Sequence, residues 1–494
     1  MIITDIRPLL VVAFPLIAAI LILNSGKHPN LREAFSIGGA LASVILVFSM
    51  VPDVRSGKEF SWTLCKITDT LSLTLRTDLA GILFACVSSF LYLVVIFYAI
   101  GYMRGHHEKN QTGFYTFFAI CICSAFGIAF ADNLLTFFIF FEMLTIATWP
   151  LVFHERSAQA KYSGRKYLIY TLIPGQIFLA GIIAVYCICG TLTFQPGGFL
   201  QNYNISPGIL MLVFFMLIGA GAVKAGMMPF HGWLPSAMVA PTPVSALLHA
   251  VAVVKAGAFC CIRIMCYVYG PTLLADLPAN QIMGIISVFT IICASLIALG
   301  QDNLKRRLAY STVGQLSYVV LGTSMLSAAS LTGAMFHIVA HAVMKITLFM
   351  CAGAIIVTTH KNNVSEMRGI GRQMPITMGC YTIAALGIVG LPLTVGFQSK
   401  WNLALGALSI HQPVYIVILL VSSMLGIAYL LPVTYIAFFS KNESGDFTRF
   451  KEADLRMLIP ICITAVLVII LGMFPNFGLH LFDIAKTAAN AIMH

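Results

Sequence analysis

Eight side chains that can bind and release a proton lie within stretches of the sequence that are otherwise apolar. An ionisable group inside a membrane costs about 3 kcal/mol or more, so groups of this kind that recur along a chain are functional candidates. The chemistry that they support is the transfer of protons from one group to the next. The eight residues are Glu142, Lys224, His249, Lys255, His337, His341, Lys345 and Lys400.

Glu142 is the only acidic residue in "NLLTFFIFFEMLTIATWPLVF", residues 133–153. A carboxylate that is alone in hydrocarbon takes up a proton, whereas a nearby ammonium keeps it charged and couples the two titrations. Lys224 is the natural partner, so the sequence predicts an ion pair between these two residues.

Proline predicts that the helix carrying Lys224 is interrupted. Pro229 cannot donate a backbone hydrogen bond, so the helix should break about one turn after Lys224. Unwound backbone at membrane depth must line a cavity or be buried in protein. We expect Lys224 to lie beside this break and to exchange a proton there; the alternative is a lysine that snorkels from a helix end. The next helix should begin near Pro241 and carry His249 and Lys255.

His337, His341 and Lys345 follow one another at intervals of four residues. This spacing places three titratable groups on one face of a helix, over about 12 Å. A single histidine in a protein core is usually only a hydrogen-bonded core residue. Three aligned groups on an apolar helix favour a path for protons.

A second interrupted helix is predicted before Lys400, where Gly390 and Pro392 weaken the helix. Paired interrupted helices in corresponding positions of two halves are typical of inverted repeats with ion sites near the middle of the membrane. The match is incomplete, because "LAYSTVGQLSYVVLG", which should correspond to the helix of Glu142, contains no acidic residue.

The composition identifies the elements that must hold these groups. Hydrophobic residues make up 59% and charged residues 10% of the 494 residues, which excludes a soluble globular domain. Spans of about 20 apolar residues recur about fourteen times. We therefore predict an all-α polytopic membrane protein with two inverted five-helix repeats, each containing a broken helix. The first span lacks a cleavage site and is expected to be a retained helix.

The predicted spans divide the chain into four parts. Residues 1–112 hold three helices and a strand-like hairpin, expected outside the cytoplasm. The two repeats, or half-channels, are residues 113–269 and 281–439. Residues 440–494 are a loop and the fourteenth helix.

The net charge of +11 is distributed by loop and indicates topology rather than nucleic-acid binding. One set of loops holds 18 of the 29 lysine and arginine residues, so the positive-inside rule makes these loops cytoplasmic and leaves both termini outside. The set is Lys27, Arg32, Arg104, Lys109, Arg156, Lys161, Arg165, Lys166, Lys305, Arg306, Arg307, Lys361, Arg368, Arg372, Lys441, Arg449, Lys451 and Arg456. The exception on the outer side is the hairpin region, with Arg55, Lys58, Lys66 and Arg76.

Between about Leu79 and Phe439 the chain resembles a known family. It is the antiporter-like subunit family shared by Mrp-type cation/proton antiporters, membrane-bound hydrogenases and respiratory complex I. The matching stretches are "FEMLTIATWPLV", "PFHGWLPSAMVAPTPVSALLHAVAVVKAG", "LKRRLAYSTVGQLSYV", "HIVAHAVMKITLFMCAGAI" and "GLPLTVGFQSKW".

The resemblance implies a role for each candidate residue. Glu142 and Lys224 would form the ion pair of the first half-channel, and Lys400 would be the terminal residue of the second. The groups between them, His249, Lys255, His337, His341 and Lys345, would form the central axis. Asp302, Lys305 and Arg306 match a motif of a cytoplasmic loop, for which a structural role is the stronger interpretation.

The implied function is proton translocation, with cation exchange as an option, by one subunit of a multisubunit complex in a prokaryotic cytoplasmic membrane. The expected partners are other membrane subunits, including further antiporter-like ones, and a soluble iron–sulfur, hydrogenase or dehydrogenase arm. No cofactor, metal site or catalytic centre is expected in the chain itself. Lys255 together with Lys400 fits an Mrp D-like or hydrogenase-type subunit.

Other hypotheses stay open at this point. The chain could be a structural or coupling part of a membrane arm, a self-sufficient antiporter, or a module of inorganic-carbon uptake with a zinc-bearing soluble partner. The sequence leaves open whether Na⁺, K⁺ or only H⁺ moves, in which direction, and what drives the movement.

Overall fold

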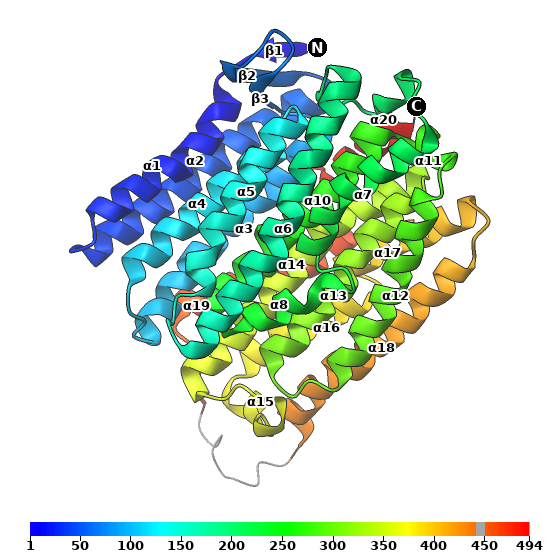
Figure 1. The fold of residues 1–494 in the computed structure, drawn as a ribbon. Helices are drawn as coiled ribbons and strands as arrows, with labels where there is room; N and C mark the ends of the chain where they lie inside the picture. Colours follow the sequence, from blue (N-terminus) through cyan, green and yellow to red (C-terminus); the bar gives the residue numbers. More distant parts are fainter. Residues whose placement is uncertain (441–449, 494) are drawn as a thin grey trace.

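The computed structural model describes residues 1–440 and 450–493, and most of them are helical (Figure 1). The predicted basic residues Lys441 and Arg449 lie outside the described residues. Twelve helices in the described part of the chain are long and apolar enough to cross a membrane. They are α1 (Arg7–Asn24), α2 (Pro29–Arg55), α3 (Leu79–Gly105), α4 (Gln111–Ala129), α5 (Leu134–Val152), α6 (Ala158–Cys189), α7 (Pro207–Lys224), the helix over Thr242–Tyr269, α12 (Ala279–Leu299), α14 (Ala328–Thr359), α18 (Val414–Phe439) and α19 (Leu455–Met473).

Two further elements bring this set to the predicted fourteen. α13 (Leu304–Ser324) is long enough to span, but polar residues such as Thr312, Gln315 and Ser317 lower its hydropathy, and all three are buried against neighbouring helices. The other element is a pair of half-helices, α16 (Pro375–Val389) and α17 (Val395–Ser409). The prediction of an all-α polytopic membrane protein is confirmed.

The first predicted break is found where α7 ends, at Lys224. The chain then turns through η2 (Phe230–Gly232), α8 (Trp233–Ser236) and η3 (Ala237–Val239) before the next helix begins with α9 (Thr242–Ala246). The interruption follows Lys224 directly, as Pro229 predicted.

The second break lies between α16 and α17. Gly390 caps the end of α16 with a φ of +90°, a left-handed conformation that glycine adopts without a steric penalty. Pro392 follows two residues later, and the chain resumes a helix at Val395. Each group of five consecutive spans therefore contains one broken helix, in the fourth place. The inverted relation of the groups stays a prediction.

Two spans are fully buried and form the centre of the bundle. These are α14 and the helix over Thr242–Tyr269. Helices that are apolar on all sides belong inside a large membrane protein. In Figure 1 they lie between α1 and α2 on one side and α12 and α18 on the other.

The helix over Thr242–Tyr269 is irregular along its length. After α9 it widens into a π-helical segment, η4 (Leu247–Val251), continues as α10 (Val253–Arg263) and widens again in η5 (Ile264–Tyr269). Wide turns of this kind occur frequently at functional sites. Its sequence of small and β-branched residues gave no sign of this geometry.

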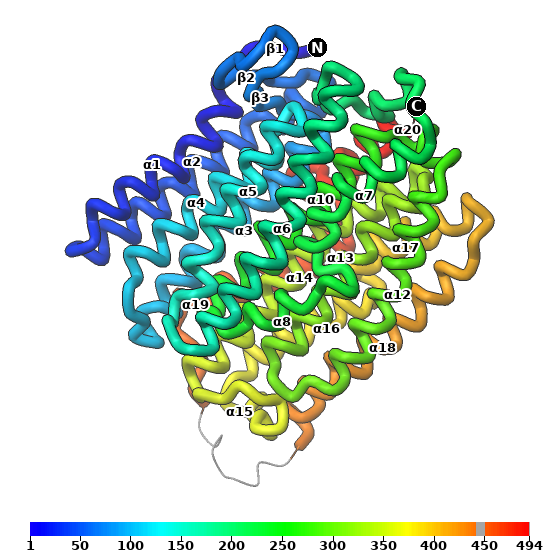
Figure 2. The backbone as a smooth tube through the Cα atoms, in the orientation of Figure 1, coloured from blue at the N-terminus to red at the C-terminus, as the bar shows by residue number. Residues whose placement is uncertain are grey.

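The predicted hairpin consists of β2 (Glu59–Lys66) and β3 (Ser72–Arg76), which pair antiparallel. A third strand that the sequence did not indicate, β1 (Ile2–Thr4), pairs parallel to β2. Both ends of the chain lie at the hairpin end of the bundle (Figure 2), which agrees with an even number of spans.

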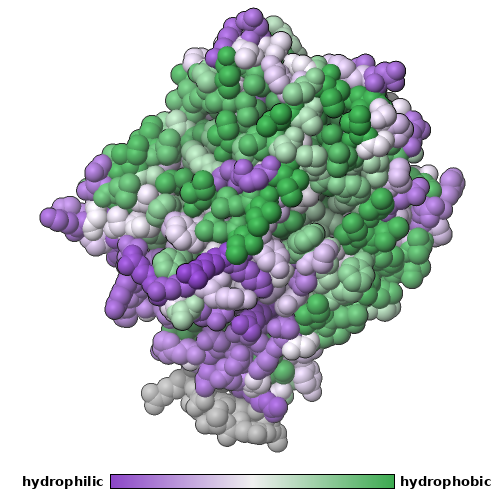
Figure 3. Space-filling model, viewed as in Figure 1, coloured by the Kyte–Doolittle hydropathy of each residue, from purple (hydrophilic) through white to green (hydrophobic). Residues whose placement is uncertain are grey.

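One helix was missed by the sequence analysis. The amphipathic α20 (Leu481–Met493) follows α19 and packs against α14 and α3. The remaining short elements are η1 (Leu200–Asn202), α11 (Pro271–Ala275), η6 (Val364–Glu366) and α15 (Ile370–Gln373). On the face shown in Figure 3, hydrophobic residues cover the upper and right parts, and hydrophilic residues gather toward the lower end.

Candidate functional site

The predicted ion pair is present between α5 and the end of α7. Nζ of Lys224 lies 3.5 Å from Oε1 of Glu142. The same ammonium donates a hydrogen bond to the carbonyl of Phe141 at 2.5 Å and lies 3.3 Å from the centre of the Phe141 ring. Lys224 is only 1% exposed. The lysine is therefore held by one charge, one carbonyl and one aromatic face.

The carboxylate of Glu142 has few other partners. Neither of its oxygens accepts a hydrogen bond from residues 1–440 or 450–493. Gly175 of α6 packs directly against it, because a Cβ added at this glycine would lie 2.6 Å from Oε1. Only a residue without a side chain fits here. Lys224 is the one cation within ion-pair distance of Glu142 among the described residues.

Lys255 connects the helix over Thr242–Tyr269 to α14. Its Nζ lies 2.7 Å from Nδ1 of His341 and donates to the carbonyl of Ile338 at 3.0 Å. Both side chains are fully or almost fully buried. A titratable pair thus lies in the centre of the bundle.

The titratable residues Glu142, Lys224, Lys255 and His341 form a row through the bundle, and His337 and Lys400 continue this row toward the second break. Nδ1 of His337 lies 2.8 Å from Oγ of Ser399, the residue that precedes Lys400. The rings of His337 and His341 are 6.0 Å apart between their centres. The stacking on one face of α14 that their spacing predicted is therefore present.

The Lys400 ammonium binds the end of the other half-helix. It donates to the carbonyls of Ile388 and Val389, at 2.8 and 2.9 Å, and to Oγ of Ser423 at 3.0 Å. The two carbonyls are the last of α16, and such a helix end attracts a cation. The interruption between α16 and α17 therefore supplies the backbone carbonyls that bind the Lys400 ammonium.

Two candidates flank the row rather than extending it. Lys345 donates to the carbonyl of Leu308 on α13 at 2.9 Å. His249 stacks on Phe349 with ring centres 4.5 Å apart, and neither of its ring nitrogens has a hydrogen-bond partner among the described residues.

Close helix packing joins the first ion pair to the centre. A Cβ added at Gly257 of α10 would lie 2.3 Å from the backbone nitrogen of Ala225, the residue after Lys224. The glycine thus brings the end of α7 into backbone contact with the helix of Lys255.

The loop motif lies apart from this row. Asp302 accepts hydrogen bonds from the backbone and hydroxyl of Ser365 at 3.0 and 2.7 Å, and Nζ of Lys305 donates to the carbonyl of Ala240 at 2.9 Å. The Arg306 side chain is exposed. The neighbouring Arg307, which is not part of the predicted loop motif, is buried and donates to the Gln301 carbonyl at 2.7 Å. These contacts agree with a structural role.

Sequence reasoning missed a buried ion pair near the hairpin. Arg263 in α10 forms two hydrogen bonds to the carboxylate of Asp78, which precedes α3. Both residues are buried, and the guanidinium also packs on Phe259 and Tyr267. The sequence feature that could have revealed this ion pair is an arginine, Arg263, within an otherwise apolar stretch.

A second missed contact lies at the opposite end of α5. Nε2 of His154 is 3.8 Å from a carboxylate oxygen of Glu108, and the His154 side chain is 4% exposed. Burial lowers the pKa of His154, although the nearby Glu108 opposes this shift. Burial likewise raises the pKa of the adjacent Glu155.

Comparison with known proteins shows which family has this sequence pattern. Residues 131–426 match the family described as "NADH:quinone oxidoreductase/Mrp antiporter, TM". This chain belongs to that family. The matched region includes Glu142, Lys224, Lys255, His341 and Lys400.

Two curated proteins are similar to this chain over most of its length. The NADH-quinone oxidoreductase subunit N of Desulforudis audaxviator (strain MP104C) is 31% identical, over 94% of this chain and 95% of that protein. The Na(+)/H(+) antiporter subunit A1 of Staphylococcus aureus (strain JH9) is 30% identical over 86% of this chain. Only 55% of that relative is covered, so the chain spans about half of its length.

Solved structures of membrane complexes share the fold. A chain of the Mrp complex from Dietzia sp. DQ12-45-1b superposes with a TM-score of 0.87 at 19% identity, covering 99% of this chain and all of that chain. A chain of the membrane-bound sulfane sulfur reductase, an archaeal respiratory membrane complex, gives 0.88 at 24% identity, covering 99% and 98%. The chain is thus an integral membrane protein with the antiporter-like subunit fold.

Proposed function

We propose that the chain translocates protons along the row formed by Glu142, Lys224, Lys255, His341, His337 and Lys400, with Lys345 and His249 beside it. Residues 113–269 would form one half-channel and residues 281–439 the other. The observation that carries this proposal is the short contact between Lys255 and His341, which places two proton-exchanging groups 2.7 Å apart in a fully buried centre.

The electrostatics of the first ion pair would control the movement. Two unit charges about 4 Å apart interact by about 4 kcal/mol at an effective dielectric constant near 20. A proton that binds Glu142 removes this attraction, because the carboxylate becomes neutral. Lys224 then loses the charge that holds its proton, and transfer toward α10 becomes more favourable.

The ends of the row would exchange protons with opposite sides of the membrane. Both termini and the hairpin are proposed to lie outside the cytoplasm, on the basis of the loop charges. Cys65 on β2 is exposed and gives a test of this orientation. A membrane-impermeant maleimide should label Cys65 in intact cells, and labelling only after lysis would reverse the topology.

The relatives bear subunit names, and we propose that this chain also assembles with other membrane subunits, including antiporter-like ones, in a prokaryotic cytoplasmic membrane. A soluble redox arm and exchange for Na⁺ are extensions of this proposal. The subunits that copurify with the chain would separate them, because iron–sulfur or nickel proteins indicate a redox-driven complex and small hydrophobic partners alone indicate an antiporter.

The decisive experiment compares variants in the assembled complex after reconstitution into liposomes. Glu142→Gln and Lys400→Ala should abolish coupled proton movement, followed with a pH-sensitive dye, while all subunits remain assembled. Arg306→Gln, at an exposed position outside the row, is the matched control and should transport normally. Proton movement at the wild-type rate in both row variants would instead support a structural or coupling subunit whose partners carry the ions.

A further inference from the structure

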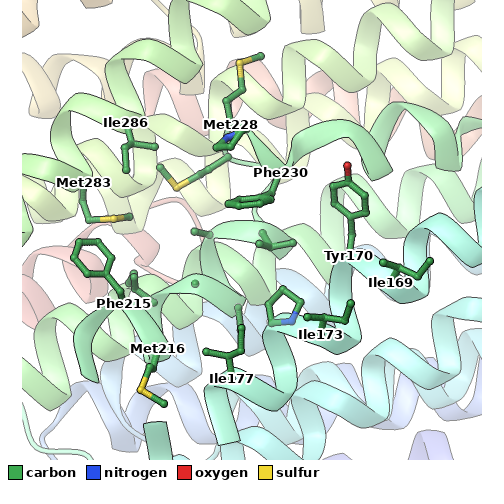
Figure 4. Close-up of a pocket in the computed structure, with 18 residues that line it drawn as sticks. Ile169, Tyr170, Ile173, Ile177, Phe215, Met216, Met228, Phe230, Met283 and Ile286 are labelled. Atoms are coloured by element: carbon green, nitrogen blue, oxygen red, sulfur yellow. The ribbon is translucent and has the colours of Figure 1, made fainter. Parts of the chain in front are cut away.

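An open apolar cavity of about 540 Å³ lies between α6, α7 and α12 (Figure 4). We refer to it as the α6–α7–α12 cavity. Phe215 and Met283 border one side of it in this view, Ile169 and Tyr170 border the other, and Phe230 lies along the edge formed by the break. The Tyr170 hydroxyl is the only polar side-chain group among the lining residues.

The cavity opens on the outer surface of the helix bundle. Ile173 and Phe230, which line it, are 57% and 54% exposed although they lie in the spanning part of the chain. Met228 and Pro229, within the first break, form part of its wall. The backbone N–H groups of Met228 and Phe230 are already paired within the protein, with the Thr290 hydroxyl at 3.1 Å and the Met227 carbonyl at 2.9 Å, so this part of the break can face hydrocarbon. An empty apolar space forfeits dispersion contacts with its walls, and a hydrocarbon occupant restores them.

A cation lies at one end of the cavity. Nζ of Lys166 lies 3.3 Å, and the Tyr170 hydroxyl 3.8 Å, from the position that a Cβ of Gly232 would take. No carboxylate of residues 1–440 or 450–493 is within ion-pair distance of Lys166. This end therefore offers a positive charge and a hydroxyl to an anion.

The dimensions match one leaflet of a bilayer. Lys166, Tyr170, Ile173 and Ile177 follow one another on the same face of α6. The axial distance from Lys166 to Ile177 is about 16 Å at 1.5 Å per residue. Half of a bilayer's hydrocarbon core is about 15 Å thick.

We propose that the α6–α7–α12 cavity binds one acyl chain of an anionic phospholipid, whose phosphate pairs with Lys166 and accepts a hydrogen bond from Tyr170. The chain of the lipid runs along α6 toward Ile177 and covers the break at Met228 and Pro229. The lipid thus seals the irregular backbone that follows Lys224 on the side that faces the membrane.

Native mass spectrometry of the purified full-length protein tests this proposal. The protein is equilibrated in detergent micelles that contain equal amounts of phosphatidylglycerol and phosphatidylcholine. The wild type should retain phosphatidylglycerol preferentially. Lys166→Gln should lower the ratio of retained phosphatidylglycerol to phosphatidylcholine about fivefold, the loss expected when one basic side chain no longer attracts an anionic headgroup. The exposed Lys161 of the same helix provides the control, and Lys161→Gln should keep the ratio.

A second pair of variants tests the acyl-chain site. Gly219 lines the cavity, and no atom lies within 4 Å of a Cβ added there. Gly219→Leu should therefore fold normally and fill the space, so that retention of both lipids falls. Gly208 of the same helix has equally free surroundings and does not line the cavity, so Gly208→Leu should retain lipid.

Three outcomes would overturn the proposal. The first is equal retention of the two lipids by the wild type, and the second is undiminished retention in Gly219→Leu. The third comes from a photo-crosslinking amino acid introduced at Ile173 in the intact complex. Crosslinking to a lipid supports the proposal, whereas crosslinking to a protein subunit shows that a helix covers the cavity.

Discussion

Lys255 and His341 lie 86 residues apart in the sequence and 2.7 Å apart in the fold, measured from Nζ to Nδ1. While Lys255 is charged it can only donate, so in that state Nδ1 of His341 accepts and the imidazole proton resides on Nε2. Nε2 is buried and has no hydrogen-bond partner among the described residues. The contact thus couples the tautomer of His341 to the protonation state of Lys255.

This pair should behave as one unit in transport. Lys255→Met and His341→Gln should each reduce proton movement in reconstituted complex by at least about tenfold, and the double variant should be no slower than the worse single one, because either change removes the same step. Dye-quenching rates at equal protein content measure the effect. Losses that multiply in the double variant would mean that the two residues act independently.

Gly175 offers a way to disturb the first ion pair without changing its charges. In Gly175→Ala the added methyl would lie 2.6 Å from the Glu142 carboxylate and push it from its place beside Lys224. Proton movement should fall about tenfold while the complex still assembles. Gly208→Ala, where a Cβ meets nothing within 4 Å, is the control for loss of a glycine. A wild-type rate in Gly175→Ala would show that the 3.5 Å separation of the pair is not required.

The spans and both breaks could be predicted from the sequence, because apolar runs, proline and glycine act locally on the backbone. The pair of Glu142 with Lys224 could be predicted because a carboxylate in an apolar span needs a nearby cation to stay charged. The partners of Lys400 could not be predicted, since they are backbone carbonyls of another half-helix and carry no sequence signal. The π-helical turns around His249 could not be predicted either, because the small and β-branched residues there carry no signal for a widened helix. α20 was missed because it is too short to span a membrane.

The buried pair of Asp78 and Arg263 should contribute to stability rather than to transport. Removing one member leaves the other charge buried and unpaired, which costs about 3–5 kcal/mol. Arg263→Met should therefore lower the free energy of unfolding by about this amount, measured by denaturant titration in detergent. Lys58→Ala removes the more exposed pair with Asp53 and should cost at most about 1 kcal/mol. Equal effects of the two changes would contradict the assignment.

His154 should make stability depend on pH. Burial lowers its pKa in the folded protein below the ordinary value of 6.5. The stability contributed by the neutral ring is therefore complete above pH 6.5 and is lost as pH falls through the lowered pKa. His154→Gln should reduce the difference in melting temperature between pH 7.5 and pH 5.5. An unchanged difference would assign the pH dependence to other groups.

The carbonyls of Ile388 and Val389 explain how the second half of the molecule manages without an acidic counterpart of Glu142. A carboxylate can be neutralised by a proton, whereas the dipole of a helix end cannot be titrated away. The counter-charge beside Lys224 is thus a titratable side chain, whereas the one beside Lys400 is a fixed dipole. In the proton row that we propose, the two ends therefore differ before any partner or membrane potential acts on them.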